Sequence, residues 1–126
     1  MKRQLLFIVL LSVLTVACGK GEKARIPAQV WKDITFKIET HPYPVRAGHN
    51  EIWLKATKLE GGPAWNLVVS MRANASQEWV QSVQDGHIGV FRRAVKITEG
   101  DRYLYMHLRR GKSETELKFE LPWVEK

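Results

Sequence analysis

Hydrophobic and polar residues alternate along most of the chain after position 30, and a period of two predicts β-strands. In the segment 34–39, Ile34, Phe36 and Ile38 alternate with polar residues, so that one face of a strand can be buried. Five further segments repeat this pattern, at 51–56, 65–71, 91–97, 103–108 and 116–121. In three of these segments the side chains expected to point inward are Ile52, Leu54, Ala56, Trp65, Leu67, Val69, Met71, Leu117, Phe119 and Leu121.

Residues that favour turns separate these segments. They occur in His41-Pro42-Tyr43-Pro44 with Gly48, Gly61-Gly62-Pro63, Asp85-Gly86, Glu99-Gly100-Asp101 and Arg110-Gly111-Lys112. No segment has a clear helical stripe, although Trp79, Val80 and Val83 suit a helix as well as a short edge strand. The pattern predicts an all-β fold, an immunoglobulin-like antiparallel β-sandwich of six or seven strands.

The first 17 residues follow a different pattern. Lys2 and Arg3 provide a positive start, and residues 5–16 are apolar except for Ser12 and Thr15. This run is shorter than the roughly 20 apolar residues that a membrane-spanning helix needs, and its layout is that of an export signal. We therefore expect residues 1–17 to be a signal peptide.

The end of this run, Thr15-Val16-Ala17-Cys18, resembles the lipobox of bacterial lipoproteins. In that family the cysteine is diacylated and becomes the new N-terminus, so the resemblance implies a lipid on Cys18. Thr15 stands where the family usually has leucine. The alternatives are an ordinary buried thiol or the last residue of a simple secretory signal. Two acyl chains would attach the protein firmly to a membrane, facing the periplasm or the exterior.

Removing residues 1–17 leaves 109 residues with 18 basic and 13 acidic side chains, a net charge of +5. This length suits one domain. Residues 18–29 are expected to form the lipidated cysteine and a flexible tether, and residues 30–126 the β-sandwich domain. Because Cys18 is the single cysteine, no intramolecular disulfide can form.

Several short stretches between residues 34 and 121 resemble the small β-sandwich domains of FixH-like and YtkA-like exported bacterial proteins. The matching stretches are 34–40, 42–52, 61–64, 67–71, 85–91, 103–105 and 117–121. The resemblance implies an exported or membrane-tethered domain. Some members of this family are associated with the assembly of copper-containing respiratory oxidases.

That association raises the question of a metal site. His41, His49 and His87 all fall in predicted turns and are the candidate ligands, which makes a periplasmic copper-binding protein an alternative function. The simpler interpretation places these histidines on the surface and Met71 and Met106 in the core. The sequence predicts no cofactor.

Motifs of catalysis are missing from the sequence. It contains no Gly-x-Ser-x-Gly, no His-Glu-x-x-His and no phosphate-binding glycine loop, so we expect a non-catalytic protein.

Aromatic residues are the candidate interface: Tyr43, Trp53, Trp79 and Tyr105. Five tryptophans and the positive charge also suggest a basic nucleic-acid-binding module, with Arg92-Arg93, Arg109-Arg110 and Lys112 along one edge and Trp53 as a stacking platform. Export would remove that partner, and the arginines have a simpler role in keeping strand edges from pairing. We therefore expect a lipid-anchored binding or accessory domain of the cell envelope that contacts an unidentified envelope protein.

Overall fold

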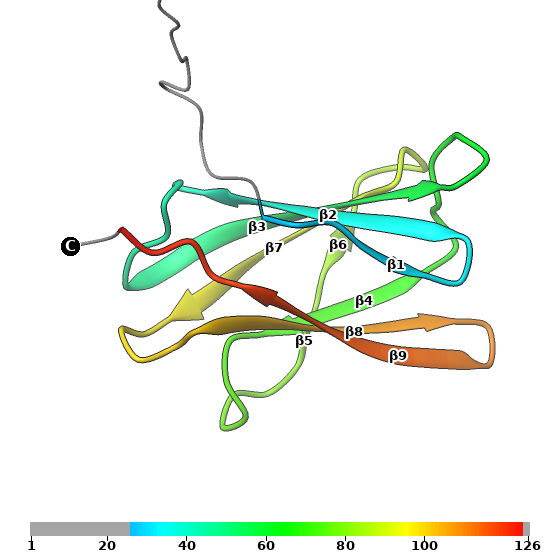
Figure 1. The fold of residues 1–126 in the computed structure, drawn as a ribbon. Helices are drawn as coiled ribbons and strands as arrows, with labels where there is room; N and C mark the ends of the chain where they lie inside the picture. The colour runs from blue at the N-terminus through cyan, green and yellow to red at the C-terminus, as the bar shows by residue number, and fades with distance from the viewer. Residues whose placement is uncertain (1–25, 125–126) are drawn as a thin grey trace, which may run out of the picture.

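A computed structural model describes residues 26–124 and shows two β-sheets packed face to face (Figure 1). This part of the chain contains no helix. Its nine strands are β1 (Gln29–Trp31), β2 (Ile34–His41), β3 (Gly48–Lys58), β4 (Val68–Arg72), β5 (Val80–Gln81), β6 (Val83–Gln84), β7 (Val90–Ile97), β8 (Tyr103–Arg110) and β9 (Ser113–Glu120). The predicted immunoglobulin-like antiparallel sandwich is therefore confirmed.

The first sheet has the strand order β1-β2-β3-β7-β6, and the second has the order β5-β4-β8-β9. Every pair of neighbouring strands is antiparallel. The six segments that alternate in the sequence correspond to β2, β3, β4, β7, β8 and β9. The strand count is nine rather than six or seven because β1, β5 and β6, of two or three residues each, are added.

The core lies between the sheets and is formed by the inward face of each long strand. Side chains with no exposed surface include Phe36, Ile52 and Leu54 in the first sheet and Leu104 and Leu108 in the second. Each contributes on the order of 1.5–3 kcal/mol of hydrophobic free energy before the loss of conformational entropy. The core also contains Met71 and Met106, as the simpler interpretation of the sequence predicts, and the two residues are opposite each other in the β4–β8 register.

The segment 74–83, which fits two patterns in the sequence, is not helical. It contains a loop followed by β5 and β6, which belong to different sheets although one residue, Ser82, separates them. The backbone N–H and the hydroxyl of Ser82 both donate to the carbonyl of Val69, at 2.8 and 2.9 Å. Ser82 thus fixes the point at which the chain crosses between the sheets.

Trp65 differs from its prediction. It was expected to point inward, but its side chain is 45% exposed because β4 begins only at Val68. Leu67, Val69 and Met71 are buried as expected. The alternation therefore starts within the loop, where the sheet does not yet fix the direction of the side chains.

The sandwich has two distinct ends (Figure 1). At one end, which we call the terminal end, the turns β2–β3 and β7–β8 lie near Ile26 and Val124, the first and last described residues. At the opposite loop end lie the β3–β4 loop (59–67) and the β6–β7 turn (85–89). The β3–β7 register separates the ends, since Gly48 pairs with Ile97 and Lys55 pairs with Val90.

Candidate functional site

The loop end carries a group of exposed apolar and aromatic side chains, which we call the loop tip: Leu59, Trp65, His87 and Ile88. Leu59 and Ile88 are 61% and 62% exposed. The indole of Trp65 stacks on the imidazole of His87, with ring centroids 4.4 Å apart and ring planes 24° apart. Large exposed apolar side chains that gather at one place are typical of an interaction site.

Backbone hydrogen bonds hold the two loops of the tip together. The N–H of Ala56 donates to the carbonyl of Gly89 at 2.8 Å, and the N–H of Ala64 donates to the carbonyl of Ala56 at 2.9 Å. Across the loops, Gln84 Nε2 donates to the carbonyl of Trp65 at 2.6 Å. These bonds fix the backbone that carries the exposed side chains, which lowers the entropy lost on binding.

Gly89 explains why the β6–β7 turn approaches β3 so closely. Its φ is +81°, and a Cβ atom at this position would lie 2.6 Å from the carbonyl oxygen of Ala56 and 3.1 Å from Cβ of Pro63. A side chain would therefore push the two loops apart.

The outer face of the first sheet carries a second aromatic group around Trp53. His41 packs on its indole at 4.7 Å between ring centroids, and the Arg92 guanidinium lies 5.3 Å from the Trp53 ring. Lys55 Nζ lies 2.9 Å from a carboxylate oxygen of Glu39, and this bond holds the pKa of the Glu39 carboxyl below its ordinary value. These charged neighbours cover part of Trp53, which is half-buried.

The outer face of the second sheet carries a third group, around Trp79 and Tyr105. The Arg72 guanidinium lies 4.2 Å from the Trp79 ring centroid, and Arg72 pairs in register with Tyr105. Next to it, the rings of Tyr103 and Tyr105 are 6.3 Å apart. Arg72 Nη1 also donates to the carbonyl of Gln77 at 3.1 Å, and both Trp79 and Tyr105 are half-buried, so this face is less open than the loop tip.

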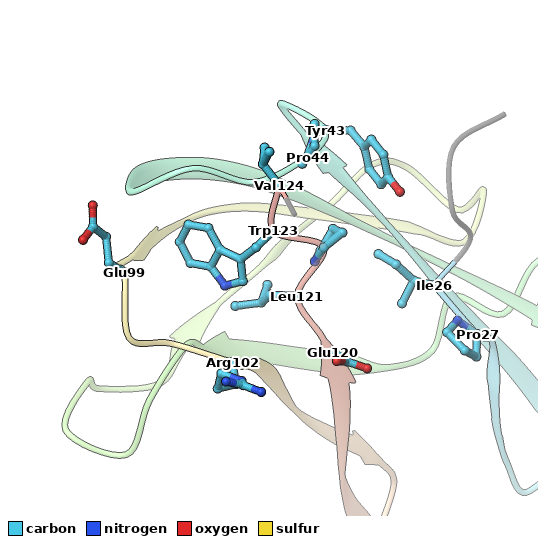
Figure 2. Close-up of a pocket in the computed structure, with 11 residues that line it drawn as sticks. Ile26, Pro27, Tyr43, Pro44, Glu99, Arg102, Glu120, Leu121, Trp123 and Val124 are labelled. Atoms are coloured by element: carbon cyan, nitrogen blue, oxygen red, sulfur yellow. The ribbon is translucent and has the colours of Figure 1, made fainter. Parts of the chain in front are cut away.

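The four predicted interface residues are all half-buried, but they lie on three separate surfaces. Trp53 is on the outer face of the first sheet, and Trp79 and Tyr105 are on that of the second. Tyr43 lies at the terminal end, where it borders a hollow of about 670 Å³ (Figure 2).

The three candidate metal ligands do not come together. His41 ends β2 and His49 is the second residue of β3, both towards the terminal end, whereas His87 belongs to the loop tip at the other end. Within residues 26–124, no three His, Cys, Asp or Glu side chains are grouped so that they could hold a metal ion. Cys18 lies outside the described residues.

The basic residues proposed to line one edge lie in different sheets. Arg92 and Arg93 belong to β7 of the first sheet, and Arg109 and Arg110 belong to β8 of the second. Arg110 Nη1 donates to a carboxylate oxygen of Asp33 at 2.7 Å. No single basic edge is formed by these arginines.

Of the loop tip, sequence reasoning singles out only His87, as a candidate metal ligand. Leu59 and Ile88 lie near turn glycines and belong to no alternating segment, and the alternation predicts that Trp65 is buried. The signal that points to them is a large apolar residue inside a turn, where a polar residue is the usual choice.

Comparison with known proteins adds no relative, since no protein family model, no curated protein and no solved structure matches this chain. The class of protein that the fold defines is a small all-β, immunoglobulin-like sandwich domain. Across residues 26–124, the structure has no helix that is long and apolar enough to cross a membrane.

Proposed function

We propose that this protein is a lipid-anchored, non-catalytic binding or accessory domain of the cell envelope, and that the loop tip contacts a protein partner. The single observation that supports it best is the position of the loop tip. An exposed stacked pair and two exposed aliphatic side chains lie at the end of the sandwich opposite the first described residue, Ile26.

The chemistry of the loop tip favours a protein surface as the partner. Trp65 offers a large flat apolar area with few rotatable bonds, which is typical of residues that dominate binding free energy. Leu59 and Ile88 are further exposed apolar side chains at the same end, and the exposed imidazole of His87 adds a polar group beside the indole. The charged residues next to the tip are engaged in ion pairs, Lys58 with Glu60 and Arg92 with Asp85, each at 3.9 Å.

The proposal of a lipid anchor is based on the sequence around Cys18. The test is the mass of the N-terminal peptide from the native membrane fraction, which should begin at Cys18 and carry the added mass of the acyl chains. Cys18→Ala should release the chain from the membrane fraction or leave it unprocessed. An unmodified Cys18 in a full-length cytosolic chain would contradict the proposal.

The partner contact is tested with a photo-crosslinking amino acid at Ile88 in intact cells. A matched control is the same amino acid at Val124, which is 60% exposed against 62% for Ile88 but lies at the terminal end. We expect a cross-linked protein from position 88 only, and Trp65→Ala should abolish it. Cross-linking that is equal at both positions, or that persists in Trp65→Ala, would argue against this site.

A further inference from the structure

The terminal end contains a hollow, shown in Figure 2, whose border differs in composition from the loop tip. Four segments that are far apart in the sequence border it. They are the first described residues with Ile26, the β2–β3 turn with Tyr43 and Pro44, the β7–β8 turn with Glu99 and Arg102, and the segment 120–124 with Trp123 and Val124. Most of this border is apolar or aromatic. Apolar groups and amphipathic rings in one place suit the boundary between water and lipid.

The border of the hollow is held rigidly. Trp123 Nε1 donates to the carbonyl of Asp101 at 2.7 Å, so that the indole is fixed to the β7–β8 turn. The N–H of Val45 donates to the carbonyl of Pro122 at 3.0 Å, which joins the end of the chain to the β2–β3 turn. Val124 follows directly and is 60% exposed.

Exposed charged side chains of both signs border the hollow. Arg102, Glu99 and Glu120 line it, and Arg46 lies in the β2–β3 turn that supplies Tyr43 and Pro44. The sequence 19–25, which leads to Ile26, adds three basic residues and one acidic residue. Basic residues close to a bilayer are attracted to anionic headgroups.

The length of chain between the predicted lipid and the hollow limits how far apart they can be. Cys18 precedes Ile26 by eight residues, which span at most about 28 Å when fully extended. If Cys18 carries the lipid, Ile26 lies within about 28 Å of the bilayer, which favours the terminal end as the part of the sandwich that faces it. The loop tip lies at the other end.

We propose that the terminal end rests on the phospholipid surface, with Val124, Pro44 and Tyr43 in contact with the headgroup region and Arg46 and Arg102 facing anionic lipid. This inference depends on the lipid anchor of the proposed function. It adds an orientation, in which the domain stands on the membrane and presents the loop tip away from it.

The experiment uses the complete, lipidated chain with one introduced cysteine, Val124→Cys or Ile88→Cys. Because Cys18 is acylated in the anchored protein, a thiol-reactive fluorophore such as bimane labels only the new cysteine. The two sites are equally exposed and lie at opposite ends, so they form a matched pair. Each labelled protein is reconstituted into vesicles of phosphatidylethanolamine and phosphatidylglycerol with brominated acyl chains.

We expect quenching by the brominated lipid that is several-fold stronger at position 124 than at position 88. Arg102→Glu should weaken the quenching at 124, whereas Lys112→Glu, at the loop end, should leave it unchanged. Equal quenching at both positions, or stronger quenching at 88, in protein that sediments with the vesicles would overturn this orientation and leave the anchor intact. Failure to sediment, with an unmodified Cys18 by mass, would contradict the anchor and the orientation together.

Discussion

Trp65 and His87, which are 22 positions apart in the sequence, stack on each other at the loop end with 4.4 Å between their ring centroids. The contact joins the β3–β4 loop to the β6–β7 turn. It depends on the register of β3 and β7, which brings Lys55, near the end of β3, opposite Val90, the first residue after the β6–β7 turn. The stacked pair therefore reports on the same loop geometry that presents the proposed binding surface.

The first prediction concerns the energy of this stack. A double-mutant cycle of Trp65→Ala and His87→Ala should give a coupling free energy of about 0.5–1.5 kcal/mol, the range expected for stacked aromatic pairs. Urea denaturation followed by circular dichroism measures it. Trp65→Phe should retain most of the coupling because a flat ring remains, and purely additive effects would mean that the stack does not form in solution.

The second prediction concerns the close approach of the two loops. Gly89→Ala should lower the free energy of unfolding by about 2–5 kcal/mol, because the strain of φ at +81° adds to the clash of the new methyl group with the carbonyl of Ala56. Gly86→Ala is the matched control, since Gly86 also has a positive φ, +61°, but no atom lies within 4 Å of the added Cβ. Gly86→Ala should cost about 1–2 kcal/mol, the strain of a left-handed residue alone. Equal losses would mean that the loops are not in contact.

The third prediction concerns Asn50, a buried polar residue below the β2–β3 turn. Asn50 Nδ2 donates to the carbonyls of Arg46 and Gly48 at 2.7 and 3.0 Å, and Oδ1 accepts from the N–H of Arg46 at 3.2 Å. Asn50→Ala should cost about 1–3 kcal/mol in the free energy of unfolding, because backbone groups of the turn lose their partners. Asn66→Ala, at an exposed loop position, should have a negligible effect in the same denaturation experiment. An Asn50→Ala protein as stable as the native one would contradict this role.

The fourth prediction concerns acid stability. The hydrogen bond from Lys55 holds the pKa of the folded Glu39 carboxyl below its ordinary value of 4.5. The ion pair therefore adds to the free energy of unfolding above pH 4.5, and this contribution is lost as the pH falls through the folded pKa. Because both side chains are about half exposed, the contribution should stay below about 1 kcal/mol.

Glu39→Gln and Lys55→Met should each make the free energy of unfolding less dependent on pH in the acid range. Denaturation midpoints measured at a series of pH values test this. An acid slope identical to that of the native chain in both variants would show that the pair does not form.

The long strands could be predicted because the alternation in them is strict. In β2 and β3, Ile34, Phe36, Ile52 and Leu54 point inward as their spacing requires, since neighbouring side chains on a strand point to opposite faces. The immunoglobulin-like class followed from the number of such segments and the turns between them.

The short strands and the loop tip could not be predicted for a physical reason. β5 and β6 have two residues each, too few to show a period, and the change of sheet at Ser82 depends on hydrogen bonds to Val69 on another strand. The position of Trp65 beside His87 depends on strand register, which local spacing does not encode. Strand register also decides which of the candidate aromatic residues share a surface, so their separation onto three surfaces could not be predicted either.

Ile26 and Val124 line the same hollow, and this makes the domain suitable for circular permutation. A short peptide could join these two positions, and the polypeptide could be reopened in the hairpin at Gly111 to give a circular permutant. Such a permutant should fold into the same pair of sheets, with its new N- and C-termini on the far side of the domain.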